Sequence, residues 1–227
     1  MTVLEICVQD LGGVLAARDF GADRVEVCED LSVGGLTPSL GLVEGSLALG
    51  RVDVQVLVRP RAGDFVHDEA EVAQILRSIA GFSRLREGAG VNLGFVVGAL
   101  RGDGRINVEA ARAFRDAAGD APLTFHRGFD EAPDLFEALD QLLELGYDRV
   151  LTTGGDGSVA DTAMLRALQE RAGEELTVLA SGGLRSHNVA RAIRESGARE
   201  VHMRAPLPDG STDPQEVRRI VEAVRAL

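Results

Sequence analysis

GADRVEVCEDLSVGG, residues 21–35, opens with a pattern that returns twice, as GYDRVLTTGG from residue 146 and GAREVHMRAP from residue 197. In each copy a glycine closes a segment with helical periodicity, and an apolar run begins two or three residues later. Glycine closes a helix in the left-handed conformation at no steric cost. A continuous apolar run is typical of a strand buried on both faces. The repeated unit is therefore helix, glycine, strand and loop, which predicts a parallel sheet with functional groups on the loops after the strands.

Eight units of this kind cover the chain. The expected strands are residues 3–7, 24–28, 53–58, 91–97, 122–126, 149–152, 176–180 and 200–203. The expected helices are residues 10–21, 39–49, 68–86, 107–118, 133–145, 159–172, 186–196 and 214–226. The alternative is an open doubly wound sheet, but no GxGxxG follows the first strand. Eight strands alternating with eight helices predict an α/β fold, a (β/α)8 TIM barrel formed by residues 1–227 as a single domain.

Composition narrows the function. The net charge of −12 argues against nucleic acid or an anionic membrane surface as a partner. All 24 basic residues are arginine, and the absence of lysine excludes Schiff-base aldolases, pyridoxal phosphate enzymes and Walker A nucleotide sites. The N-terminus does not resemble a signal peptide, and no apolar stretch approaches the length of a membrane span. We expect a cytoplasmic protein whose two cysteines stay reduced.

Acidic and basic residues near the ends of the predicted strands indicate a site, since barrels of this class carry their chemistry at the carboxyl ends of the strands. Glu5 and Glu26 lie in the first two strands, where burial is costly unless each carboxylate has a partner. Arg59 and His126 are the expected partners. The four could form a structural ion-pair network, but we expect them to be catalytic or ligand-binding.

A second group of polar residues follows the strands and predicts binding of a small anion. Its members are Arg61, Asp64, Arg127, Asp130, Thr152, Ser181, Gly182, Gly183, His202 and Arg204. The loops after strands seven and eight are a frequent phosphate site in these barrels. We expect sulfate, phosphate or carboxylate to bind between Arg59, His126 and the turn at residues 181–185, which ends in Arg185. His67 and His187 are expected to be ordinary surface residues.

Cys7 and Cys28 lie on adjacent predicted strands, each two residues beyond one of the acids. Neighbouring strands are about 4.8 Å apart, so the two sulfur atoms can meet if the register agrees. Two thiolates with few other ligands suit Cu(I). Buried free cysteines, however, most often serve as small apolar residues, and the spacing matches no metal-binding motif.

The sequence resembles the CutC family. The resemblance rests on LEICV (4–8), GADRVEVCEDLSVGGLTPS (21–39), VRPRAGDF (58–65), TFHRGFD (124–130), DRVLTTGG (148–155) and SGGLR (181–185). It implies a cytoplasmic (β/α)8 barrel, often a homo-oligomer, that acts in copper homeostasis. It also implies Cu(I) as a ligand, with Cys7 and Cys28 as its metal site, and brings no agreed enzymatic reaction.

Two functions therefore remain open. The first is a copper homeostasis protein that binds Cu(I). The second is a TIM-barrel enzyme, of isomerase or lyase type, acting on a small anionic and possibly phosphorylated carbonyl compound or sugar. In that enzyme Glu5 or Glu26 would be the base, His126 the acid and Arg59 the clamp for the anion. A scaffold without a ligand fits the polar strand ends less well.

Overall fold

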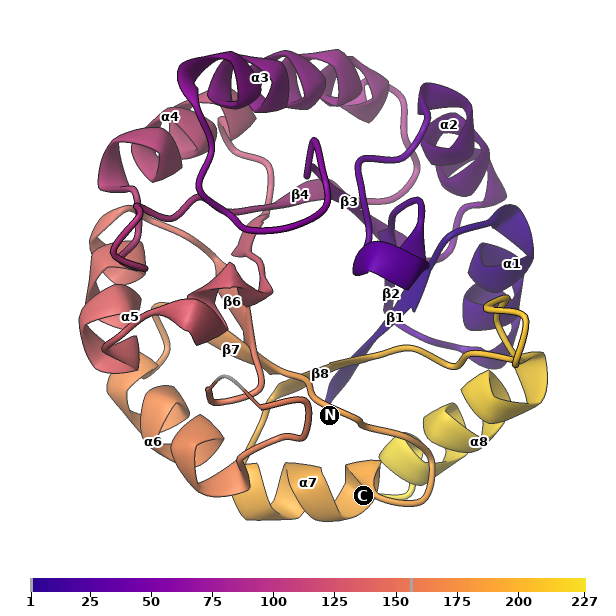
Figure 1. Cartoon of the computed structure of the whole chain (residues 1–227). Helices are drawn as coiled ribbons and strands as arrows, with labels where there is room; N and C mark the ends of the chain where they lie inside the picture. Colours follow the sequence, from indigo (N-terminus) through magenta and orange to yellow (C-terminus); the bar gives the residue numbers. More distant parts are fainter. Residues whose placement is uncertain (1, 156) are drawn as a thin grey trace.

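The computed structural model describes residues 2–155 and 157–227, and its eight strands close into a parallel barrel in chain order (Figure 1). The strands are β1 Val3–Val8, β2 Arg24–Val27, β3 Asp53–Leu57, β4 Leu93–Val97, β5 Leu123–Phe125, β6 Arg149–Thr152, β7 Thr177–Ala180 and β8 Glu200–Met203. The sheet closes where β1 pairs with β8, with Glu5 opposite His202. The predicted (β/α)8 barrel is confirmed.

Eight α-helices form a ring around the strands (Figure 1). They are α1 Leu11–Phe20, α2 Leu40–Leu49, α3 Glu69–Ser83, α4 Val108–Ala118, α5 Leu135–Glu144, α6 Thr162–Ala172, α7 Val189–Ser196 and α8 Pro214–Arg225. Gly21, Gly146 and Gly197, the glycines of the repeated pattern, have φ of 90°, 72° and 71°. The expected left-handed helix ends are therefore present in all three copies.

Two helices begin three residues later than predicted. Helix α6 begins at Thr162 rather than 159, because the Asp161 side chain accepts hydrogen bonds from the N–H groups of Ala163 and Met164. Helix α7 begins at Val189 rather than 186. The chain before it is held in a turn by the Arg185 N–H, which donates to the Asn188 side chain.

The main apolar core lies between the strands and the surrounding helices, and the interior of the barrel holds a polar network near the amino ends of the strands. Near the amino ends of the strands, Arg149 donates to Thr124 and Gln55, and Arg24 pairs with Glu200 at 2.5 Å. Gly94 on β4 leaves room for Gln55, since a Cβ there would lie 2.5 Å from its side-chain oxygen. These contacts fill the amino end of the barrel, and the opposite end, at the carboxyl ends of the strands, is left for a ligand.

No helix in the described residues is both long enough and apolar enough to cross a membrane.

Candidate functional site

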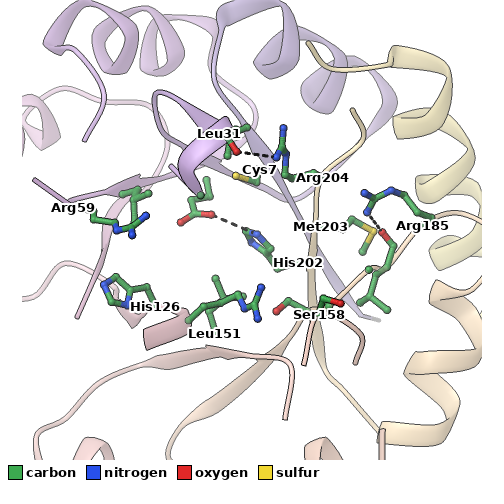
Figure 2. Close-up of a pocket in the computed structure, with 18 of the residues that line it drawn as sticks. Cys7, Leu31, Arg59, His126, Leu151, Ser158, Arg185, His202, Met203 and Arg204 are labelled. Carbon is green, nitrogen blue, oxygen red and sulfur yellow. Dashed lines mark hydrogen bonds and ion pairs between the residues drawn. The ribbon is translucent and has the colours of Figure 1, made fainter. Parts of the chain in front are cut away.

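A cavity of about 410 Å³ opens at the carboxyl ends of the strands (Figure 2). Its lining includes three of the four residues that we expected to be catalytic or ligand-binding: Glu26, Arg59 and His126. Arg59 and His126 lie on one side, and Arg185 and Arg204 lie on the other (Figure 2). The cavity therefore combines strand-end residues from both halves of the barrel.

Glu5 lies deeper, and its partners differ from those predicted. Its carboxylate accepts a hydrogen bond from Arg24 and is 2.7 Å from His202 Nδ1, so Arg59 and His126 are not its partners. Burial opposes the charge on Glu5, but Arg24 and His202 outweigh it and lower the pKa of this carboxyl below its usual range. Glu5 is thus a buried, fully partnered anion, which argues against the role of base.

Glu26, His202 and Cys7 form a compact group at the base of the cavity. Each offers one metal-binding atom, and these atoms lie within 4.8 Å of one another. His202 Nε2 is 3.5 Å from Glu26. Burial raises the pKa of Glu26, and the negative charge of Glu5 acts in the same direction. For His202, burial is outweighed by its contacts with Cys7 and Glu5 and by the charge of Glu26, which raise its pKa well above the usual value.

The side chains of Cys7 and Cys28 are in contact, as the two adjacent strands allowed. Cys7 stands opposite Glu26 in the register of β1 and β2, and Cys28 follows the end of β2. Their sulfur atoms are 3.7 Å apart, and both thiols are free and buried. The hydrogen bond with Cys28, together with burial, raises the pKa of the Cys7 thiol. Cys7 lines the cavity.

His126 is fixed as a neutral side chain. Burial lowers its pKa to about 3, and the charges of Arg59 and His67 act in the same direction. Its Nδ1 accepts a hydrogen bond from the Gly128 N–H at 3.1 Å, so the single ring proton is on Nε2. Nε2 has no hydrogen-bond partner among the described residues. The ring packs over Gly98, where a Cβ would lie only 2.4 Å from it. His126 can therefore donate a hydrogen bond but is a poor base.

Arg59 keeps its charge without a carboxylate. Its guanidinium donates to the carbonyl oxygens of Val33, Gly35 and Gly63, and it lies over the ring of Phe65 at 4.9 Å. The Nε atom is buried and has no partner among the described residues.

The remaining predicted residues divide into two sets. Arg127, Ser181, Gly182, Gly183, His202 and Arg204 line the cavity. Arg61 and Asp64 do not: Arg61 pairs with Asp64 at 2.9 Å and with Glu71 at 2.5 Å on the surface. Asp130 and Thr152 are buried and bonded to each other, so they hold the loops after β5 and β6 together. These four are supports outside the cavity lining, unlike the ligand contacts expected of them.

Sequence reasoning missed several residues of this region. Arg24, the main partner of Glu5, was expected only as part of the second strand and not as a partner of the acids. His67 was expected at the surface but is buried, beside Glu71. Ser158 lines the cavity from the loop after β6, and no sequence pattern marked it. Strand parity, which places Arg24, Glu26 and Cys28 on one face, was the available signal for Arg24.

The chain is similar to known proteins over most of its length. The sequence model of the CutC family matches residues 2–206. The chain is 40% identical over 206 residues to a CutC family protein of Mesorhizobium japonicum, covering 90% of this chain and 78% of that protein. The chain belongs to the CutC family. Its human relative, named copper homeostasis protein cutC homolog, is 37% identical over 204 residues, covering 89% of this chain and 73% of that protein.

Solved structures agree with this CutC assignment. A CutC protein from Streptococcus agalactiae superposes with a TM-score of 0.82 at 29% identity, covering 89% of this chain and 98% of that one. Phosphoribosylanthranilate isomerase from Thermotoga maritima gives a TM-score of 0.67 at 16% identity and covers the full length of both chains. At that identity the second likeness shows a shared barrel fold.

Proposed function

We propose that this CutC family member acts in copper homeostasis by binding Cu(I) at the base of the cavity. The observation that carries the proposal is the pair of sulfur atoms of Cys7 and Cys28, 3.7 Å apart. Two metal–sulfur bonds of about 2.3 Å can span that separation, so one ion can bind both. Soft thiolates select Cu(I) over the hard divalent cations.

Cys7 is the central ligand of the proposed site. It lines the cavity, contacts Cys28, and belongs to the group with Glu26 and His202. Its raised pKa keeps the thiol protonated until a metal arrives. Cu(I) must displace that proton, because the thiolate is the ligand, so binding releases protons to the solvent. Cys28 would supply the second sulfur.

The test is a competition titration with a chromogenic Cu(I) chelator under anaerobic, reducing conditions. The wild type should bind one Cu(I), the Cys7→Ser variant none, and the Cys28→Ser variant should bind at least tenfold more weakly. Urea unfolding of each variant controls for loss of the fold. Unchanged stoichiometry in the double serine variant would refute the proposal. Full binding by Cys28→Ser, with loss in Cys7→Ser, would replace the thiol pair by Cys7, Glu26 and His202.

A second candidate function is acid–base chemistry on a small anionic carbonyl compound. The observation that favours it is the presence in one cavity of Glu26, whose pKa is raised, and of neutral His126, whose Nε2–H has no partner. A carboxyl with a raised pKa suits proton transfer near neutral pH. A neutral imidazole can donate a hydrogen bond to a carbonyl oxygen as negative charge develops there. Arg59 would hold the anionic group.

Deuterium exchange tests this second function. Dihydroxyacetone phosphate and glyceraldehyde 3-phosphate, incubated with the protein in D2O, should incorporate deuterium beside the carbonyl, as followed by NMR. Glu26→Gln should abolish the exchange while Glu222→Gln, on exposed α8, should not alter it. Equal exchange in both variants, or none in the wild type, would remove support for this function.

We further propose a cytoplasmic homo-oligomer. The two free thiols support the cytoplasmic location. The family resemblance supports both the location and the homo-oligomer. Light scattering at several protein concentrations would measure the oligomeric state.

A further inference from the structure

The lining of the cavity carries an excess of positive charge. Four arginines line it, Arg59, Arg127, Arg185 and Arg204, against a single carboxylate, Glu26. The chain as a whole has a net charge of −12. The cavity is therefore opposite in sign to the rest of the molecule, and such a cavity attracts and concentrates anions.

Three of these arginines have no acidic partner among the described residues. Arg127 pairs with Asp130 at 3.0 Å. The guanidinium groups of Arg59, Arg185 and Arg204 donate only to backbone carbonyl oxygens, which carry no net charge. An ion pair on an exposed surface contributes little free energy. A bound anion interacts more strongly with guanidinium groups around a cavity that is partly closed to water.

The turn after β7 adds neutral donors beside two of these arginines. Gly182 and Gly183 line the cavity with φ of 105° and 61°, and their N–H groups have no acceptor among the described residues. A Cβ on Gly182 would lie 2.5 Å from the backbone nitrogen of Ala160, so only glycine allows the two loops to approach. This approach places Ser158 in the same lining. Successive free N–H groups in a glycine turn are a recurrent means of binding phosphate.

We propose that this wall of the cavity binds the phosphate group of a small phosphate monoester, through the turn at Gly182 and Gly183, Ser158, Arg185 and Arg204. A phosphate dianion matches two guanidinium groups and several N–H donors better than a singly charged carboxylate does. A cavity of about 410 Å³ is larger than phosphate alone requires, and the remaining space reaches His126 and Glu26. The assignment rests on the second candidate function, whose substrate class it names, and it replaces Arg59 by Arg185 and Arg204 as the residues that hold the anionic group. It is independent of copper.

Calorimetric titration tests it with inorganic phosphate, glycerol 3-phosphate, glycerol and acetate at low ionic strength. Glycerol 3-phosphate should bind at least as tightly as phosphate, and glycerol and acetate should bind at least tenfold more weakly. Arg185→Ala is the informative variant, because the Arg185 guanidinium donates only to the carbonyl oxygen of its neighbour Leu184, and the backbone N–H that donates to Asn188 is kept in alanine. It should weaken glycerol 3-phosphate binding by about tenfold to a hundredfold, the effect of one charged hydrogen-bond donor.

The matched control is Arg194→Ala, which removes the same charge from the exposed face of α7 outside the cavity. It should leave the affinity within twofold of the wild type. Equal losses in Arg185→Ala and Arg194→Ala, no heat with glycerol 3-phosphate at 10 mM, or tighter binding of acetate would each overturn the proposal. Cys7→Ser should retain wild-type phosphate binding, and Glu26→Gln should retain it while losing deuterium exchange. Failure of the phosphate site is therefore distinguishable from failure of copper binding or of catalysis.

Discussion

Glu5→Gln should remove a large part of the stability of this barrel, because it leaves two buried cations short of their anion. The Glu5 side chain is 1% exposed and contacts Arg24 through one oxygen and His202 through the other. A hydrogen bond to a charged group is worth about 1.5–3 kcal/mol, and removing one member of a buried ion pair costs about 3–5 kcal/mol. Glutamine keeps one acceptor oxygen, and Arg24 keeps Glu200, so we expect a loss of about 3 kcal/mol.

The assay is urea unfolding followed by circular dichroism, with Glu222→Gln as the matched control. Glu222 pairs with Arg218 on α8 at 2.8 Å, with both side chains more than half exposed. The same substitution there should cost less than about 0.5 kcal/mol, the value of an exposed ion pair on a helix. A Glu5→Gln loss below about 1 kcal/mol, or equal losses in the two variants, would refute the reasoning that burial makes this network costly to break.

Two further predictions concern other buried groups. Tyr147 is the only tyrosine of a chain without tryptophan, and burial raises its pKa above the usual value of about 10. Its hydroxyl should therefore stay protonated above pH 10 in the folded protein, without the rise in absorbance at 295 nm that marks the phenolate, and should titrate near pH 10 in urea. Its contribution to stability is fully present below about pH 10 and should decline as the pH rises above that value, because only the unfolded state then releases the proton. Gly98→Ala should cost about 1–3 kcal/mol by overpacking against His126, whereas Gly81→Ala, with no neighbour near its Cβ in α3, should be neutral or stabilising. His126→Ala added to Gly98→Ala should abolish the overpacking cost in a double-mutant cycle, and a cost that persists would show that the clash lies elsewhere.

The barrel itself could be predicted from the chain because its signals are local. A glycine with positive φ after each of α1, α5 and α7, followed by an apolar run, fixes where a helix ends and a strand begins. Eight repeats of that unit are enough to choose a closed barrel over an open sheet. The composition also excluded a class of mechanism, because a chain without lysine cannot form a lysine Schiff base.

The site could be predicted in part. Side chains that point into a barrel alternate along each strand, so Glu5, Cys7 and Glu26 could be placed at the strand ends from the chain alone. The contact of Cys7 with Cys28 depends on the register of β1 against β2, which pairs Cys7 with Glu26 and leaves Cys28 two residues further along the chain. Register is set by the packing of the whole sheet, and local sequence does not contain it.

Only the tertiary structure decided which charges pair. Arg59 and His126 looked like partners for the acids, yet Arg24 and His202 hold Glu5, because closure of the barrel brings β8 against β1 across 197 residues of chain. The same closure places Arg59, Arg185 and Arg204 around one cavity while Arg61 and Asp64, close in sequence to Arg59, bind each other on the surface. The sequence is enough to predict which residues follow the strands. Whether a side chain then turns inward or outward depends on the space its neighbours leave, and that space exists only once the barrel has closed.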